Sequence, residues 1–147
     1  MVKIHVKVKM DAKGSLEIAR TFMRFKGGKV GVLGGDAYPN GLTAAANAAI
    51  HNFGTKTVPA RPFMDEGAKL FAASKDQVAK LYTLAIETRD ASVANQQVGA
   101  LFAQKIREAI RKGSYAALAK STIARKGSSK PLIDTGLLIG SISYEEN

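Results

Sequence analysis

The chain of 147 residues carries 22 Lys and Arg against 12 Asp and Glu, a formal net charge of +10, and it contains no cysteine. Its length suits a single domain, and we expect residues 1–147 to share one core. The lack of cysteine excludes disulfide frameworks and thiolate metal sites, and two histidines leave little for a zinc site or a catalytic triad. No stretch approaches the roughly 18 consecutive apolar residues of a membrane span, and lysines interrupt the amino-terminal segment where a signal sequence would have its apolar core.

The first 41 residues predict two strands with a short helix between them. Residues 2–10 alternate apolar and polar side chains, which predicts a half-buried strand. A short helix is expected over residues 15–25, followed by a second strand over residues 29–33. The glycines in the turn at residues 34–41 match neither phosphate-loop spacing, so a nucleotide site is not expected there.

An alanine-rich helix is expected over residues 44–53, ended by the left-handed conformation that Gly54 adopts readily. Residues 55–62 contain two prolines, which favour an extended arm.

Two long helices follow, over residues 62–89 and 94–112, with a break between them at residues 90–92. Each has an apolar stripe at helical spacing, which predicts that they pack side by side against a sheet. Gly99 inside the second helix suggests the close approach of another backbone. The polar side chains of that helix expected to face water are Gln97, Gln104, Lys105, Arg107, Glu108, Arg111 and Lys112.

The carboxy-terminal part predicts a helix over residues 115–123, a flexible basic loop over residues 124–131, one helical turn at residues 137–140 and a last strand at residues 141–145. The whole pattern predicts an α+β fold. We expect a small, mainly antiparallel sheet packed against two long antiparallel helices, with a short helix and extended arms.

The positive charge is concentrated in two places. Residues 1–30 hold eight basic and two acidic side chains, and residues 101–130 hold eight and one. If these stretches converge, they form a surface for the phosphate backbone of nucleic acid, whereas the simpler explanation is a solvated, soluble surface. No aromatic side chains are interleaved with the lysines to stack on bases, which disfavours a single-strand or RNA reader.

Three groups of residues could suggest catalysis, and each has a simpler explanation. His51 beside Asn52 lacks metal-ligand partners at defined spacing, and Asp65 with Glu66 suits the positive end of a helix dipole. The serines at residues 128–129 next to Lys130 sit in a glycine-flanked loop, a poor place for a lysine of lowered pKa. We therefore expect no enzyme, no metal and no cofactor; a small hydrolase is the catalytic alternative.

Four stretches, residues 29–41, 50–55, 58–63 and 121–142, together resemble the virion morphogenesis proteins of tailed bacteriophages, the neck and tail-completion family. The Lys-Pro-Leu-Ile-Asp-Thr-Gly run at residues 130–136 is the most specific part of this resemblance. The family-motif positions, to which we assign structural roles, are Phe53, Gly54, Pro59, Arg61, Pro62, Phe63, Pro131, Leu132, Asp134, Thr135 and Gly136.

The resemblance implies a non-enzymatic protein, made in the host cytoplasm and assembled as a ring at the head-tail junction of a virion. Its partners would be further copies of itself, other neck or connector proteins, tail terminator or tail-tube proteins, and genomic double-stranded DNA in the lumen. A tail terminator ring is a close alternative, and a basic, sequence-independent duplex-binding accessory protein is an alternative of another class. On the ring hypothesis the side chains that face DNA are Lys3, Lys7, Lys9, Arg125, Lys126 and Lys130.

Overall fold

The structure is a computed structural model, and it describes residues 27–147. Over these residues it confirms the α+β class, with helices and a two-stranded antiparallel sheet. The elements are β1 Gly28–Val32, α2 Ala44–Phe53, α3 Phe63–Ala73, α4 Lys75–Thr88, α5 Ala91–Lys112, α6 Lys120–Lys126, α7 Leu137–Gly140 and β2 Ile142–Glu146. The strand expected at residues 2–10, with Lys3, Lys7 and Lys9, and the helix expected at residues 15–25 lie outside the described residues.

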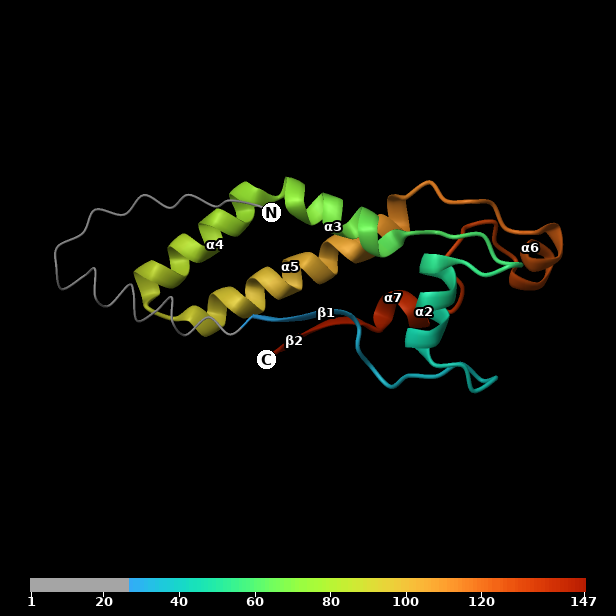
Figure 1. Cartoon of the computed structure of the whole chain (residues 1–147), viewed down its shortest axis with the longest axis horizontal. Helices are drawn as coiled ribbons and strands as arrows, with labels where there is room; N and C mark the ends of the chain where they lie inside the picture. Colours follow the sequence, from blue (N-terminus) through green and yellow to red (C-terminus); the bar gives the residue numbers. More distant parts are fainter. Residues whose placement is uncertain (1–26) are drawn as a thin grey trace.

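The helix α5 is the central element of the fold. Figure 1 shows α3 and α4 running along one side of α5, while β1 and β2 run along another side. The carboxylate of Asp90 begins α5 by accepting the backbone N–H of Ser92 at 3.0 Å, as an N-cap does. Arg111 and Lys112 occupy its last turn, where cations favour the helix dipole. The strands therefore pack on α5, which in turn separates them from the α3–α4 pair.

The long helix predicted over residues 62–89 is two helices, so that prediction was wrong in the middle. Ser74 interrupts it, with φ −90° and ψ 23°, and its hydroxyl donates to the carbonyl of Leu70 at 2.9 Å. Such a back-bond from serine competes with the regular helix ladder and promotes a bend. The bend lets α3 and α4 both follow α5, with the rings of Phe71 and Phe102 stacked at 4.5 Å.

The sheet pairs β1 with β2 in antiparallel register, Val30 opposite Tyr144 and Val32 opposite Ile142. The ring of Tyr144 covers Gly99 of α5, where an added Cβ would lie 2.2 Å from the ring. The close approach predicted from Gly99 is confirmed, but its partner is an aromatic ring and not a backbone. The absence of a side chain at Gly99 thus sets how β2 lies on α5.

The apolar core lies where α2, α3, α5 and α7 meet β2. Gly67 lets α3 come close to α5, because a Cβ at Gly67 would lie 2.7 Å from the Cα of Ile106. The buried members of the core are Ala48, Phe63, Ala103, Ile106, Ile110, Leu132, Leu138 and Ile142. Two of the four motif stretches, residues 58–63 and 121–142, therefore contribute buried residues to one core.

The prediction that Arg107 faces water was wrong. Its guanidinium donates to the carbonyl oxygens of Ile139 and Ile142, which joins α5 to the end of α7 and the start of β2. A guanidinium that meets two carbonyls at the edge of the core combines a buried stem with satisfied donors.

The helix expected over residues 115–123 is also wrong, since residues 113–119 are irregular and α6 begins only at Lys120. Two tertiary contacts account for this. The hydroxyl of Tyr115 donates to the carbonyl of Ala109 at 2.9 Å, and the carbonyls of Ala116 and Ala117 bind Arg61 instead of helical N–H groups. The basic loop expected at residues 124–131 is shorter, because α6 continues through Lys126 and ends at Gly127, with φ 70°.

Candidate functional site

The carboxyl end of α2 and the arm that follows it are held tightly. The side-chain oxygen of Asn52 accepts the backbone N–H of Met64 at 3.0 Å, which satisfies one of the free donors at the start of α3. Gly54 has φ 76°, and a Cβ there would lie 2.8 Å from the backbone nitrogen of Ala60. The hydroxyl of Thr55 accepts the N–H of Val58 at 3.0 Å. The arm is therefore a fixed turn and not a loose connection.

Arg61 lies at the centre of this region, and it is 3% exposed. Its Nε donates to the carbonyl of Ala116 at 2.9 Å, and one terminal nitrogen donates to that of Ala117 at 3.2 Å. The other terminal nitrogen lies 3.5 Å from the carbonyl of Pro59. Within the described residues no carboxylate forms an ion pair with it. This cation is satisfied by backbone oxygens, and it joins two segments more than 50 residues apart in sequence.

His51 completes the cluster, because its Nδ1 lies 3.3 Å from a terminal nitrogen of Arg61. An arginine only donates, so Nδ1 is the acceptor and the imidazole is neutral with its proton on Nε2. Burial lowers the pKa of His51 below its ordinary value, and the charges of Arg61 and Lys126 lower it further. His51, near the end of α2, is thus a structural partner of Arg61.

We expect acid to weaken the fold through His51. Its folded pKa lies below the unfolded value of 6.5, so the stability it preserves is complete above about pH 7 and declines as the pH falls below 6.5. Urea denaturation at a series of pH values from 8 to 5.5 measures this decline. The control is His51→Gln, whose side-chain oxygen accepts from Arg61 but does not titrate. Equal pH slopes for the two proteins would show that His51 does not contribute.

The motif stretch at residues 121–142 lies mostly in and beside the same core. Leu132 is buried with φ 64°, and Gly136 is the N-cap of α7, with φ 84°. The hydroxyl of Thr135 accepts the N–H of Leu137 at 3.3 Å, while Asp134 is exposed. Pro62 has φ −75° and ψ 62°, and the N–H of the next residue bonds back across it to the preceding carbonyl, as in an inverse γ-turn. These motif residues shape the backbone where the core begins.

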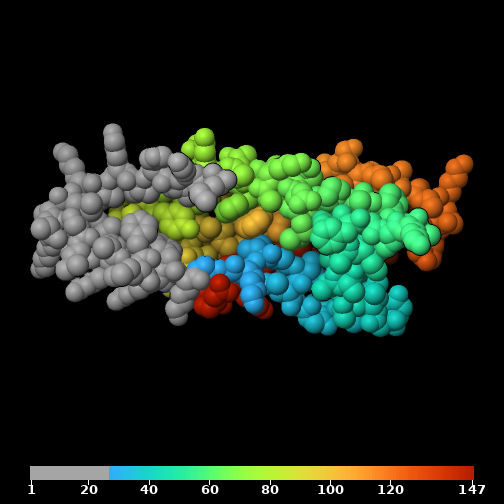
Figure 2. All heavy atoms as spheres, in the orientation of Figure 1, coloured from blue at the N-terminus to red at the C-terminus, as the bar shows by residue number. Residues whose placement is uncertain are grey.

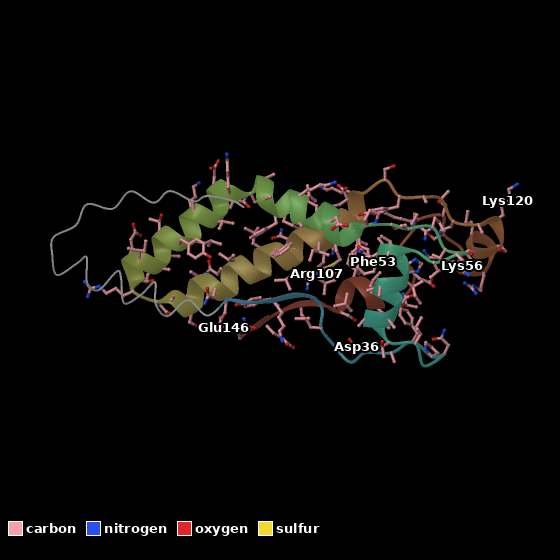
Figure 3. All side chains as sticks on the ribbon, in the orientation of Figure 1. Asp36, Phe53, Lys56, Arg107, Lys120 and Glu146 are labelled. Carbon is pink, nitrogen blue, oxygen red and sulfur yellow. The ribbon has the colours of Figure 1, made fainter. Side chains whose placement is uncertain are left out.

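Phe53 differs from the other large apolar motif residues, Phe63 and Leu132, because it is 79% exposed and lies outside the core. It is the last residue of α2 and lies between Asn52 and Gly54, both of which are fixed. Figure 3 shows its place beside the start of α3. The sequence motif identified this position but not its exposure.

The basic side chains of α6 and of the loop after it lie at one end of the molecule. Arg125 and Lys130 are exposed, whereas Lys126 is half-buried and donates to the carbonyl of Lys130 at 2.6 Å. The structure adds Lys56 and Lys120, which the sequence reasoning missed and which are exposed at the same end. Figure 2 shows this end as the orange protrusion beside the blue-green arm. We call the exposed cations Lys56, Lys120, Arg125 and Lys130 the basic end.

The remaining catalytic candidates do not converge. The hydroxyl of Ser128 accepts the N–H of Lys130 on the surface. Glu66 pairs with Lys69 at 2.7 Å on the exposed side of α3. No group of histidine and acidic side chains in residues 27–147 is arranged to hold a metal ion. None of the helices in that range is long and apolar enough to cross a membrane.

Comparison of the chain with protein-family models, with curated proteins and with solved structures found no match. The resemblance to the neck and tail-completion family therefore stays a prediction from the motif residues alone.

Proposed function

We propose that this chain is a structural virion protein that forms a ring in the neck of a tailed phage, joining the head to the tail and letting DNA pass. The observation that carries the proposal is Phe53, a motif residue whose ring is 79% exposed on a rigid turn. Large aromatic side chains presented in this way are typical anchors of protein interfaces. The motif thus supports work by contact with other proteins.

The basic end supports the passage of DNA through such a ring. Residues 113–134 contain four Lys and Arg and one acidic side chain, Asp134, so the segment keeps a net positive charge that attracts phosphate. Arg61 fixes this segment to the arm that carries Lys56. On this proposal Lys56, Lys120, Arg125 and Lys130 face the lumen, and Lys126 serves mainly to hold the loop beside it.

The same basic end favours the second candidate, a duplex-binding accessory protein that acts without a ring. The position of the chain in mature particles separates the two. We expect cryo-electron microscopy of the virion to show the chain as a closed collar between capsid and tail, and a collar at the end of the tail tube would identify the tail terminator variant. Its absence from particles, or turnover of a small molecule by the purified chain, would contradict the proposal.

Salt-dependent binding to duplex DNA tests the role of the basic end. The variant with Lys120, Arg125 and Lys130 changed to Gln should bind more weakly, with a salt slope reduced by about 2–3, because each lost phosphate contact lowers the slope by about 0.9. Neutralising Lys29, Lys75 and Arg111, which are exposed elsewhere, is the matched control. Equal slopes for both triple variants would remove the basic end as the DNA-facing surface.

A further inference from the structure

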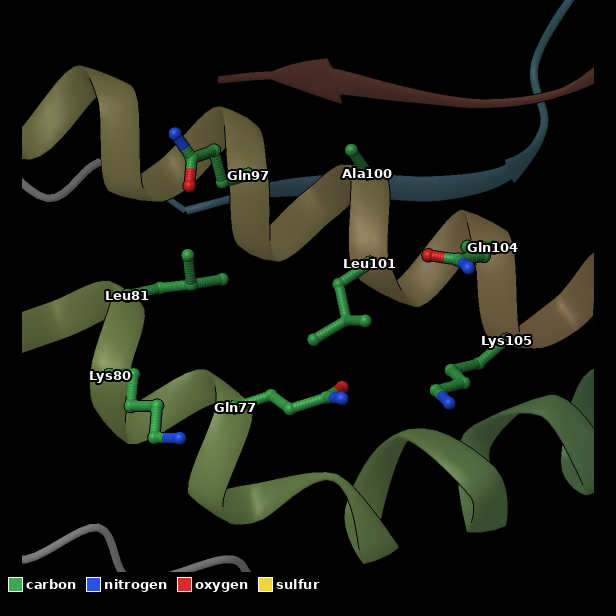
Figure 4. A pocket seen from close by; sticks show the side chains of 8 residues that line it. All are labelled: Gln77, Lys80, Leu81, Gln97, Ala100, Leu101, Gln104 and Lys105. Atoms are coloured by element: carbon green, nitrogen blue, oxygen red, sulfur yellow. The ribbon is translucent and has the colours of Figure 1, made fainter.

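A groove runs between α4 and α5 on the part of the molecule away from α2. Its volume is about 540 Å³, and Figure 4 shows Leu81 and Leu101 pointing into it from the two helices. Lys80 and Lys105 stand at its edges, together with glutamines from both helices. Leu84, one helical turn after Leu81 and 41% exposed, lies on the same side of α4. The groove therefore offers an apolar floor with a polar, positively charged rim.

Phe53 has the complementary form. Its neighbours Asn52 and Gly54 are fixed, so ordering the backbone on binding costs little. One and two turns earlier on α2, Ala49 and Ala45 are also exposed, and they leave the helix surface flat enough for another chain to come near. Phe53 thus projects from an uncrowded helix end.

We propose that Phe53 of one copy of this chain inserts into the α4–α5 groove of the next copy. The inference rests on the proposed ring and names the surfaces that would build it. Phe53 and the groove lie at different places along the molecule, as Figure 1 shows for α2 and α4, so the contact is head-to-tail. A head-to-tail contact forms a ring when its rotation closes, as the proposed collar requires, whereas a self-complementary contact stops at a dimer.

Charge supports a second copy as the occupant. Two chains of net charge +10 repel unless the surfaces that meet lack like charges. The helix α2 has no Asp, Glu, Lys or Arg, and its carboxyl end, where Phe53 lies, carries the partial negative charge of the helix dipole. That end suits a rim containing Lys80, whose ammonium can lie over the ring of Phe53, while Lys105 pairs with Glu108 at 3.3 Å.

The chain has no cysteine of its own, so disulfide cross-linking between introduced cysteines tests the contact directly. A mixture of Ala49→Cys and Ala100→Cys proteins, both of which keep Phe53, should form a covalent heterodimer under mild oxidation, because Ala49 is exposed one turn before Phe53 and Ala100 lines the groove. Ala49→Cys with Arg111→Cys, which is exposed on α5 outside the groove, should not. Light scattering on Phe53→Ala should show self-association weakened by at least tenfold, about the loss from removing an anchor.

Three results would overturn the inference. Cross-linking of Ala49→Cys to itself alone would mean a self-complementary contact, and no link to Ala100→Cys in folded proteins would mean that the groove is not the receptor. An internal link in an Ile4→Cys, Ala100→Cys double variant would place the chain's own first residues in the groove. If rings are seen in virions but the link fails, only this inference falls. If the link forms but the chain is absent from the neck, the proposed function falls instead.

Discussion

Replacing Phe63 with alanine should lower the free energy of unfolding by about 3–5 kcal/mol, the usual range for emptying a buried aromatic site. Phe63 is 0% exposed and starts α3 in the middle of the core. It packs in one cluster with Ile106 of α5, Leu132 of the motif stretch at residues 121–142 and Ile142 of β2. The alanine variant leaves a cavity where four parts of the chain meet, and urea denaturation measures the loss.

Phe53→Ala is the matched control, since it removes the same ring from a position that is 79% exposed. We expect its free energy of unfolding to stay within about 0.5 kcal/mol of the original protein. If Phe63→Ala lowers the free energy of unfolding as little as Phe53→Ala does, then Phe63 does not hold the core together.

Changing Arg61 to Met should lower the free energy of unfolding by about 3 kcal/mol, because methionine fills much of the volume of arginine but donates no hydrogen bond. The carbonyls of Ala116 and Ala117 would lose their charged donor, and His51 would lose its partner. We expect amide hydrogen exchange to rise in residues 113–126 more than in α5, since that segment depends on Arg61 for its attachment.

Arg125→Met serves as the control for Arg61→Met, because it removes an exposed guanidinium from α6. Its expected effect on stability is within about 0.5 kcal/mol. If Arg61→Met leaves exchange in residues 113–126 unchanged, then apolar contacts attach the segment and the hydrogen bonds from Arg61 do not.

Local patterns in the sequence predicted elements whose own residues determine them. The helix at residues 44–53 begins with a Thr43 side chain that accepts the N–H of Ala46, and it ends at Gly54, as its capping residues indicated. The strand pair at residues 29–33 and 141–145 is confirmed within one residue, because alternation of apolar and polar side chains reports a half-buried strand. The one-turn helix at residues 137–140 is also confirmed.

Errors occurred where a distant residue competes for the backbone. Residues 115–119 have helical composition, but Arg61 binds two of their carbonyls and Tyr115 turns back to α5. Arg107 was assigned to solvent because its position on α5 is polar, yet the carbonyls it meets belong to α7 and β2. The contacts of Arg61 and Arg107 leave no trace in the neighbouring sequence, because their partners are more than 30 residues away.

Capping, periodicity and composition act over a few residues, and they were enough to predict the α+β class, most helix ends, the two described strands and the uneven charge. The pairing of those strands, the burial of Arg61, the exposure of Phe53 and the place of Lys56 beside the cations of α6 depended on the tertiary structure. Those outcomes depend on which segments pack together, and packing is settled by the shape and hydrogen-bonding needs of the whole core.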